Sequence, residues 1–205
     1  MKILLGMPTV GNIPTKTVTS LLQTFHDVNR EDDILWPMIA EGSLVYVARD
    51  NIAQFAIEND FDYVLFADSD MIFNAGHLAR LLNHQVGICS GLYVKRVGDH
   101  KNVAYKKIIK RRYFPYRKPD LIVDDSTSGF GSVEAVGLGF CLVKVSVLKS
   151  MAKYYKSLFE PKWGVGEDVA FLIRARRLGY RTFIDRDVKL GHIGEDVYYD
   201  NSTTV

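Results

Sequence analysis

The chain contains 205 residues, of which 47% are hydrophobic and 24% are charged, and its formal net charge is +2. A chain of this size can bury one core without disulfides or structural metals, and so small a charge does not by itself indicate a polyanionic partner. No apolar run is long enough to cross a membrane. Two cysteines, Cys89 and Cys141, lie in apolar surroundings outside any C-x-x-C motif, so we expect buried free thiols in a cytoplasmic protein, free or peripheral to a membrane.

The first half of the chain alternates between apolar runs and segments with helical spacing of apolar residues. The predicted strands are residues 2–7, 33–40, 62–67 and 86–93, and the predicted helices are residues 15–29, 46–59 and 74–84. Pro37 should make the second of these strands irregular, because proline cannot donate a ladder hydrogen bond. The alternation predicts an α/β fold with a mostly parallel central sheet flanked by helices.

The middle of the chain, residues 95–118, is rich in lysine and arginine, and Asp99 is its only acidic residue. Tyrosine and phenylalanine are interleaved and the periodicity is poor, so we expect a long loop with room for a hairpin. Such a loop can bind phosphates or nucleic acid, because it combines charge neutralisation with stacking. The favoured interpretation is a lid that closes over an anionic ligand, since covering a diphosphate requires similar residues.

The remaining chain adds shorter elements. We predict strands at 120–124, 140–143, 181–185 and 187–192, a Ser/Gly-rich turn at 126–132, and helices at 146–156 and 167–179. Some of these strands form a small antiparallel addition to the parallel sheet. We therefore expect one domain over residues 1–194, with a basic flexible loop at 95–120 and a polar C-terminal tail at 195–205.

The most informative motif is Asp68-Ser69-Asp70, which directly follows the apolar run 63–67. In open α/β sheets, ligands bind at the carboxyl ends of strands, and two carboxylates there are costly unless a positive group binds them. Mg²⁺ and Mn²⁺ favour one or two carboxylates together with substrate phosphates. The same residue types are also good turn and helix-capping residues, so the motif alone leaves both interpretations open.

A second acidic pair, Glu167-Asp168, follows Gly166 at the predicted start of a helix. One of these carboxylates can serve as a general base that faces a substrate cleft, or the pair can simply cap the helix. His192 ends the last predicted strand, with glycines close by on either side. It is either a ligand or a structural histidine, and the glycines allow the chain to pass close to a ligand.

Several motifs then occur in one order along the chain. They are Pro8-Thr9, Ala48-Arg49-Asp50-Asn51, Asp68-Ser69-Asp70, Gly137-Leu138-Gly139-Phe140, Gly166-Glu167-Asp168 with Arg174, and His192. In this order and spacing, over nearly the whole chain, the sequence resembles the GT-A glycosyltransferases, particularly the family-2-like group. The resemblance implies a GT-A fold, a nucleoside-diphosphate sugar as the donor substrate, and Mn²⁺ or Mg²⁺ as the cofactor.

The resemblance also implies roles for particular residues. The donor nucleotide would lie beside Pro8, Thr9, Glu41, Arg49 and Asp68. The metal would be bound mainly by Asp70, with Asp68 and His192 completing the site. The acceptor pocket would be shaped by Gly137–Phe140. Asp168, paired with Glu167, would be the catalytic base of an inverting enzyme; a retaining enzyme of the same fold would not need that base, and the sequence does not decide between them.

Two departures from the family pattern bear on the acceptor. The chain lacks the Q-x-x-R-W motif and the membrane helices of processive polysaccharide synthases, which argues against polymer synthesis. The basic segment at 95–118 is longer and more basic than the family pattern. The acceptor hydroxyl is therefore left open among a glycan, a lipid, a protein and a nucleic acid.

Two functions of other classes stay open as alternatives. A nucleotidyltransferase acting on sugar phosphates would share the sheet and the carboxylate-bound metal. Its glycine-rich loop after the first strand should carry a basic residue, and here none occurs before Lys16. A non-catalytic nucleic-acid-binding protein would explain the basic segment, but paired acids at strand and helix ends would repel phosphates.

Overall fold

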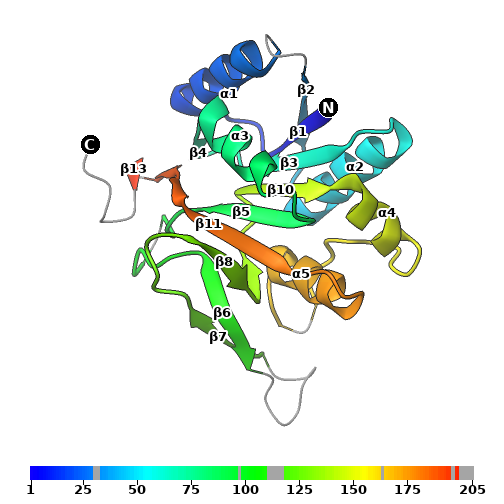
Figure 1. The fold of residues 1–205 in the computed structure, drawn as a ribbon, viewed down its shortest axis with the longest axis vertical. Coiled ribbons are helices and arrows are strands. Elements are labelled where there is room, and N and C mark those ends of the chain that lie inside the picture. The colour runs from blue at the N-terminus through cyan, green and yellow to red at the C-terminus, as the bar shows by residue number, and fades with distance from the viewer. Residues whose placement is uncertain (30–32, 97, 110–117, 163, 195–196, 199–205) are drawn as a thin grey trace.

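The main sheet of the computed structural model has seven strands in the order β2-β1-β3-β10-β5-β11-β8 (Figure 1). Their bounds are β1 (Lys2–Thr9), β2 (Ile34–Glu41), β3 (Tyr63–Ala67), β5 (Ile88–Leu92), β8 (Phe130–Val133), β10 (Phe140–Lys144) and β11 (Thr182–Lys189). The structure describes residues 1–29, 33–96, 98–109, 118–162, 164–194 and 197–198. β1 pairs in parallel with β2 and β3, and β5 pairs in parallel with β11, so the predicted mostly parallel sheet is confirmed.

One central strand, β10, runs against this order. It lies between β3 and β5 and is antiparallel to both. Its apolar run Phe140–Val143 is buried, as expected of a strand covered on both faces. The alternation of strands and helices predicts how neighbours in the chain pair, and it carries no signal for a strand inserted from a distant segment. β8 is also antiparallel and forms the edge beside β11.

Helices cover both faces of the main sheet (Figure 1). α1 (Thr15–Val28) and α3 (Ala75–Asn83) pack on one face, whereas α2 (Val45–Glu58), α4 (Val145–Ala152) and α5 (Glu167–Arg177) pack on the other. Successive residues of the central strands β3 and β10 alternate between the two cores, so these strands are apolar along nearly their whole length.

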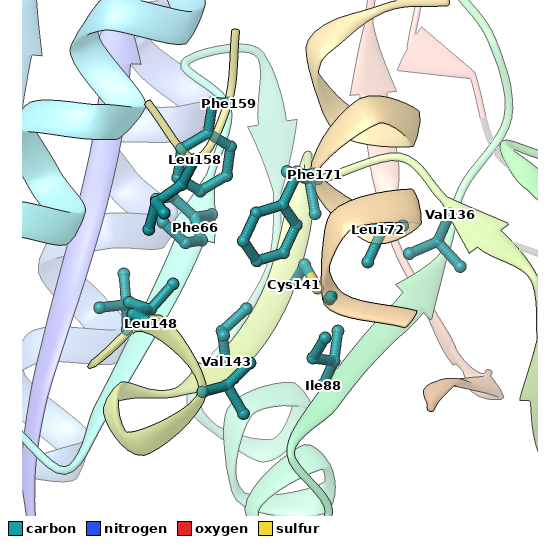
Figure 2. Close-up of a cluster of buried hydrophobic side chains, with 14 of the residues drawn as sticks. Phe66, Ile88, Val136, Cys141, Val143, Leu148, Leu158, Phe159, Phe171 and Leu172 are labelled. Carbon is teal, nitrogen blue, oxygen red and sulfur yellow. The ribbon is translucent and has the colours of Figure 1, made fainter. Parts of the chain in front are cut away.

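The core beneath α2, α4 and α5 is rich in aromatic side chains (Figure 2). Phe66 of β3 meets Phe159 edge to face, with ring centroids 5.2 Å apart. Phe159 in turn stacks on Phe171 of α5 at 4.5 Å. Aromatic pairs of this kind add packing energy beyond the burial of their area. They fix the start of α5 against the carboxyl end of β3, which is where both acidic motifs lie.

Two small antiparallel sheets complete the fold. One contains β4 (Met71–Ile72), β12 (Gly191–Ile193) and β13 (Val197–Tyr198), and the other contains β6 (Ala104–Ile109), β7 (Asp120–Val123) and β9 (Ala135–Val136). β6 and β7 form an antiparallel pair, which agrees with the hairpin expected in the region of the basic segment. Residues 97 and 110–117 of that segment lie outside the described residues, as does the predicted tail apart from β13.

Four predicted elements differ from the structure. The turn predicted at 126–132 contains the start of β8, and the helix predicted at 146–156 ends at Ala152, where two following amides bond the Met151 carbonyl. The strands predicted at 181–185 and 187–192 are instead one strand, β11, followed by the short β12. The charged run at 185–187 resembles a turn in sequence, but the strand continues through it because Asp185 pairs with Arg80 and Arg186 pairs with Asp124.

The predicted thiols are confirmed as free and buried. Burial raises the pKa of Cys89 to about 12 and raises that of Cys141 as well, so neither is a reactive thiolate. In the part of the chain that the structure describes, no helix is both long and apolar enough to cross a membrane.

Candidate functional site

Arg49 of α2 is the centre of a charge cluster at the carboxyl end of β3. Its Nη2 lies 2.6 Å from Oδ1 of Asp68, and its Nη1 lies 2.6 Å from Oε1 of Glu167. The arginine side chain is only 3% exposed. Burial opposes the charge of Arg49, but the carboxylates of Asp68, Glu167 and Asp168 raise its pKa above the usual value. One buried guanidinium therefore joins the two acidic motifs predicted from the sequence.

Gly6 of β1 determines how closely α2 approaches the sheet. A Cβ at this position would lie 2.3 Å from Cγ2 of Ile52, which follows Arg49 by about one helical turn. Any side chain at Gly6 would therefore push α2 outward. The close contact is what allows the Arg49 side chain to reach the residues that follow β3.

Asp168 lies beside this cluster at the start of α5. Its Oδ1 accepts a hydrogen bond of 2.7 Å from the Val169 N–H. Burial raises the pKa of Asp168 to about 6, and the Glu167 carboxylate adds to this shift, against the opposing effects of Val169 and Arg49. A carboxyl group that titrates near neutral pH can accept a proton from a substrate and release it again.

Asp70 belongs to a second group of charges. Its Oδ2 lies 2.5 Å from Nη1 of Arg96 and 3.5 Å from Nε2 of His192. Burial opposes the charge of Asp70, but His192 and Arg96 lower its pKa overall. Nδ1 of His192 lies 2.7 Å from the Val94 carbonyl oxygen, which can only accept a hydrogen bond, so Nδ1 carries a proton and Nε2 is directed toward Asp70.

The small sheet of β4 and β12 brings His192 to Asp70. The ladder pairs His192 with Met71, the residue after Asp70, and the Ile193 N–H donates to the Asp70 carbonyl oxygen at 2.8 Å. β4 was not predicted, because two residues carry no detectable periodicity. This two-residue strand nevertheless places the late histidine against the acidic triplet.

The glycines of the Gly137-Leu138-Gly139-Phe140 motif make room for Tyr93. A Cβ at Gly137 would lie 2.0 Å from the Tyr93 hydroxyl oxygen, and one at Gly139 would lie 2.9 Å from it. That oxygen accepts a hydrogen bond of 2.9 Å from the Gly139 N–H. The Gly139 carbonyl oxygen in turn accepts a hydrogen bond of 2.9 Å from the Asp68 N–H, so the glycine motif fixes the backbone at the start of the acidic triplet.

A cavity of about 250 Å³ opens over these residues. Its described lining includes Pro8, Thr9, Arg49, Asp68, Asp70, Arg96 and Glu167. A neighbouring cavity of about 640 Å³ is bounded by four of the same lining residues, Val10, Ser69, Asp70 and Arg96. The two together offer the space of a typical small-ligand site.

The structure thus brings most of the predicted site residues together. Three of them are absent from the described lining of the cavity. His192 adjoins Asp70 and Asp168 follows Glu167, whereas the Glu41 carboxylate lies near Gly11 at the end of β2. Arg174 belongs to the fold instead, since its guanidinium donates to the carbonyl groups of Leu158 and Glu160.

Two residues of the site were missed in the sequence. Arg96 lay within a basic segment whose members cannot be told apart by pattern. Tyr93 lay in an apolar strand and gave no polar signal of its own. The two glycines spaced by one residue at 137 and 139 were the available indication, because such spacing allows another group to approach the backbone closely.

The predicted metal ligands are only partly assembled. Among the described residues, no group of three or more His, Cys, Asp or Glu side chains is close enough to hold a metal ion. Asp70 and His192 adjoin and supply oxygen and imidazole donors, which suit Mn²⁺, whereas Asp68 is bound to Arg49. Nη1 of Arg96 approaches the same Asp70 oxygen that faces His192, so a cation bound there would compete with Arg96, whose side chain is 53% exposed.

Comparison with solved structures identifies proteins of the same fold. The chain is similar to the crystal structure of A197 from STIV, with a TM-score of 0.65 and 20% identity over 100% of this chain and 97% of that chain. It is also similar to a mutant Drosophila β-1,4-galactosyltransferase 7 solved with manganese, UDP-galactose and xylobiose, with a TM-score of 0.56 and 16% identity over 94% of this chain and 71% of that chain. No protein-family model and no curated protein sequence matches the chain. At these identities the likeness concerns the fold, and the GT-A-type fold predicted from the sequence is confirmed.

Proposed function

We propose that this protein is a metal-dependent glycosyltransferase that moves a sugar from a nucleoside-diphosphate sugar to an acceptor hydroxyl. The observation that carries the proposal is the Arg49 bridge, which joins Asp68 and Glu167 in the wall of one cavity. Asp168 directly follows Glu167 in the chain and lies within electrostatic reach of Arg49. The fold shared with a galactosyltransferase adds support but does not identify the reaction.

In this proposal the donor nucleotide lies along Pro8, Thr9 and Arg49, with Glu41 at the base and Asp68 near the ribose or the metal. Asp70 and His192 would hold Mn²⁺ or Mg²⁺, which would supply the positive charge that stabilises the departing diphosphate. Arg96 is paired with Asp70 and would have to release it for this metal site to form. Its guanidinium can then donate to phosphate oxygens, a pairing for which arginine is well shaped.

In the transfer step, the acceptor oxygen forms a bond to the anomeric carbon as the bond from that carbon to the diphosphate breaks. The bonding electron pair leaves with the diphosphate, and the acceptor proton moves to the carboxylate of Asp168. This assigns Asp168 as the general base of an inverting reaction. Glu167 keeps Arg49 in place beside it, and the raised pKa of Asp168 suits a group that must take up a proton near neutral pH.

A thermal-shift screen of UDP-, GDP-, CMP- and dTDP-sugars, with and without Mn²⁺, tests this proposal. We expect one nucleotide sugar to raise the melting temperature only when Mn²⁺ is present, because a ligand that binds the folded state stabilises it. Asp70→Ala should lose the shift, whereas Asp125→Ala, an exposed aspartate outside the cavity, should keep it. Absence of any shift, or a shift unchanged by Mn²⁺ and by Asp70→Ala, would contradict the proposal.

A further inference from the structure

A third cavity, of about 680 Å³, lies against the β6–β7 hairpin. Its lining includes Lys95, Tyr105, Lys118, Asp120, Leu121 and Val123, and it shares no lining residue with the cavity around Arg49. Figure 1 shows this hairpin extending from the main sheet near β8 and α5. Part of the basic segment is therefore built into the wall of a cavity.

Three observations place this cavity near the proposed transfer site. Burial raises the pKa of Tyr105, and the Asp168 carboxylate is the next largest cause of this shift. The Tyr105 phenol therefore lies within electrostatic reach of Asp168. The Cα of Lys118 would lie 3.3 Å from a Cβ at Gly164, in the segment that leads into α5. Lys95 directly precedes Arg96, whose guanidinium binds Asp70.

The lining carries two lysines, which come from the two ends of the basic segment. Lys118 is exposed, and the ammonium of Lys95 lies 3.5 Å from Asp99 in an exposed pair. Exposed pairs of this kind contribute little energy, so Asp99 does not prevent Lys95 from binding another anion. Leu121 and Val123 supply an apolar wall, and Asp120 supplies a carboxylate that can accept a hydrogen bond from a hydroxyl.

From this arrangement we propose that the cavity is the acceptor subsite and that the acceptor carries a phosphate group close to the hydroxyl that is glycosylated. A phosphomonoester has nearly two negative charges at neutral pH, which two lysines can match as point charges. The apolar wall packs against the carbon skeleton, and the hydroxyl is directed toward Asp168. The inference rests on the proposed function, and its phosphate source is either a soluble sugar phosphate or a lipid headgroup.

Binding of inorganic phosphate and glucose 6-phosphate to the full chain, measured by calorimetry without any sugar nucleotide, tests this subsite. We expect Lys118→Gln and Lys95→Gln each to raise the Kd about tenfold, the scale of one charge-assisted hydrogen bond. Lys118→Arg should preserve binding, which also shows that the position tolerates substitution. Lys153→Gln removes the same charge from an exposed lysine outside the cavity and should leave the Kd unchanged.

Other outcomes would overturn the subsite. Equal weakening by Lys153→Gln would indicate nonspecific attraction, and loss of binding in Arg96→Gln alone would place the phosphate in the donor cavity. Binding of a single-stranded oligonucleotide without binding of either phosphate compound would favour a nucleic-acid surface. If vesicles containing phosphatidic acid bind and the two lysine variants abolish this, the subsite is supported with a lipid as its source. Because no donor is present, these results are independent of the donor screen.

Discussion

Two acidic clusters in this fold shift the pKa of an aspartate in opposite directions. The first surrounds Asp185 of β11, whose side chain is fully buried. Nε of Arg80 lies 2.6 Å from its carboxylate, Nε2 of His84 lies 2.7 Å away, and the Asp187 N–H donates at 3.0 Å. Burial opposes the charge, but these partners lower the pKa of Asp185 overall.

The second cluster surrounds Arg49 and has the inverse composition, since one buried cation faces several carboxylates. Asp68 and Glu167 share the guanidinium, and Asp168 keeps a raised pKa of about 6. The comparison shows that a satisfied carboxylate holds the fold together, whereas a carboxylate short of positive charge is prepared to exchange a proton. The predictions below test this difference.

Removing the carboxylate charge at Asp168 should have the largest effect. Asp168→Asn should lower the transfer rate about 10²–10⁴-fold, because a positioned general base contributes on that scale. Donor binding, measured by the thermal shift with Mn²⁺, should persist. In the unsubstituted protein the rate should rise as the pH increases through about 6, where Asp168 loses its proton, and the variant should lack this rise.

The equivalent change at the satisfied cluster is the control for this prediction. Asp185→Asn should leave the pH dependence of the rate intact, since Asp185 is bound by Arg80, His84 and the Asp187 N–H, none of which belongs to the Arg49 cluster. Unchanged transfer by Asp168→Asn would rule out Asp168 as the base and would favour a retaining mechanism.

The next largest effect is expected when the Arg49 guanidinium, which Asp68 and Glu167 share, is removed. Arg49→Met should destabilise the protein by about 3 kcal/mol, because it leaves the partly buried carboxylates of Asp68 and Glu167 unpaired. Urea unfolding at neutral pH measures the change. Arg80→Met is the matched control and should cost less, since the Arg80 side chain is 48% exposed whereas that of Arg49 is 3% exposed. Equal losses would mean that the Arg49 cluster is no more dependent on its cation than the Asp185 cluster.

The two aspartates should also respond to pH with opposite signs. The pKa of Asp168 is raised from 3.8 to about 6, so the folded state resists ionisation of this carboxyl group. The protein therefore loses stability as the pH rises from about 4 to about 6. Asp168→Asn should therefore stabilise the protein by up to about 3 kcal/mol at pH 8 and have little effect below pH 4.

The pKa of Asp185 is lowered, so its contribution to stability is present at neutral pH and is lost only as the pH falls below the ordinary value of 3.8. Asp185→Asn should destabilise the protein by about 1–3 kcal/mol at neutral pH. Thermal melts of both variants from pH 4 to pH 8 measure these differences. A change of the same sign in both would contradict the contrast between the clusters.

The smallest effect on stability is expected at Arg96. Its half-exposed pair with Asp70 should be worth about 1 kcal/mol or less, so Arg96→Gln should barely alter unfolding. The same substitution should tighten Mn²⁺ binding severalfold, because the guanidinium no longer competes for Asp70. Titration with Mn²⁺ alone measures this, and weaker binding in the variant would show that Arg96 is not a competitor.

Much of the fold was predictable because its signals are local. The apolar run at 63–67 followed by an acidic triplet was predicted as a strand with a polar edge, and β3 confirms it. The antiparallel placement of β10 was not predictable, since it depends on pairing with strands far away in the chain.

The candidate site shows the same division. The acidic motifs were visible as spacing, but their connection through Arg49 depends on how closely α2 packs on Gly6. Likewise, the partner of Asp70 at Arg96 could not be selected from a run of similar basic residues. Contacts between distant segments therefore account for what the sequence did not reveal.

The pairing of β4 with β12 has a consequence for the order in which the protein matures. The acidic triplet leaves the ribosome well before His192 and the strand that carries it, because the two lie far apart in the chain. Until then β4 has no partner, and Asp70 lacks the imidazole that faces it. A nascent chain released before residue 193 can form most of the central sheet and yet leave this corner unfinished.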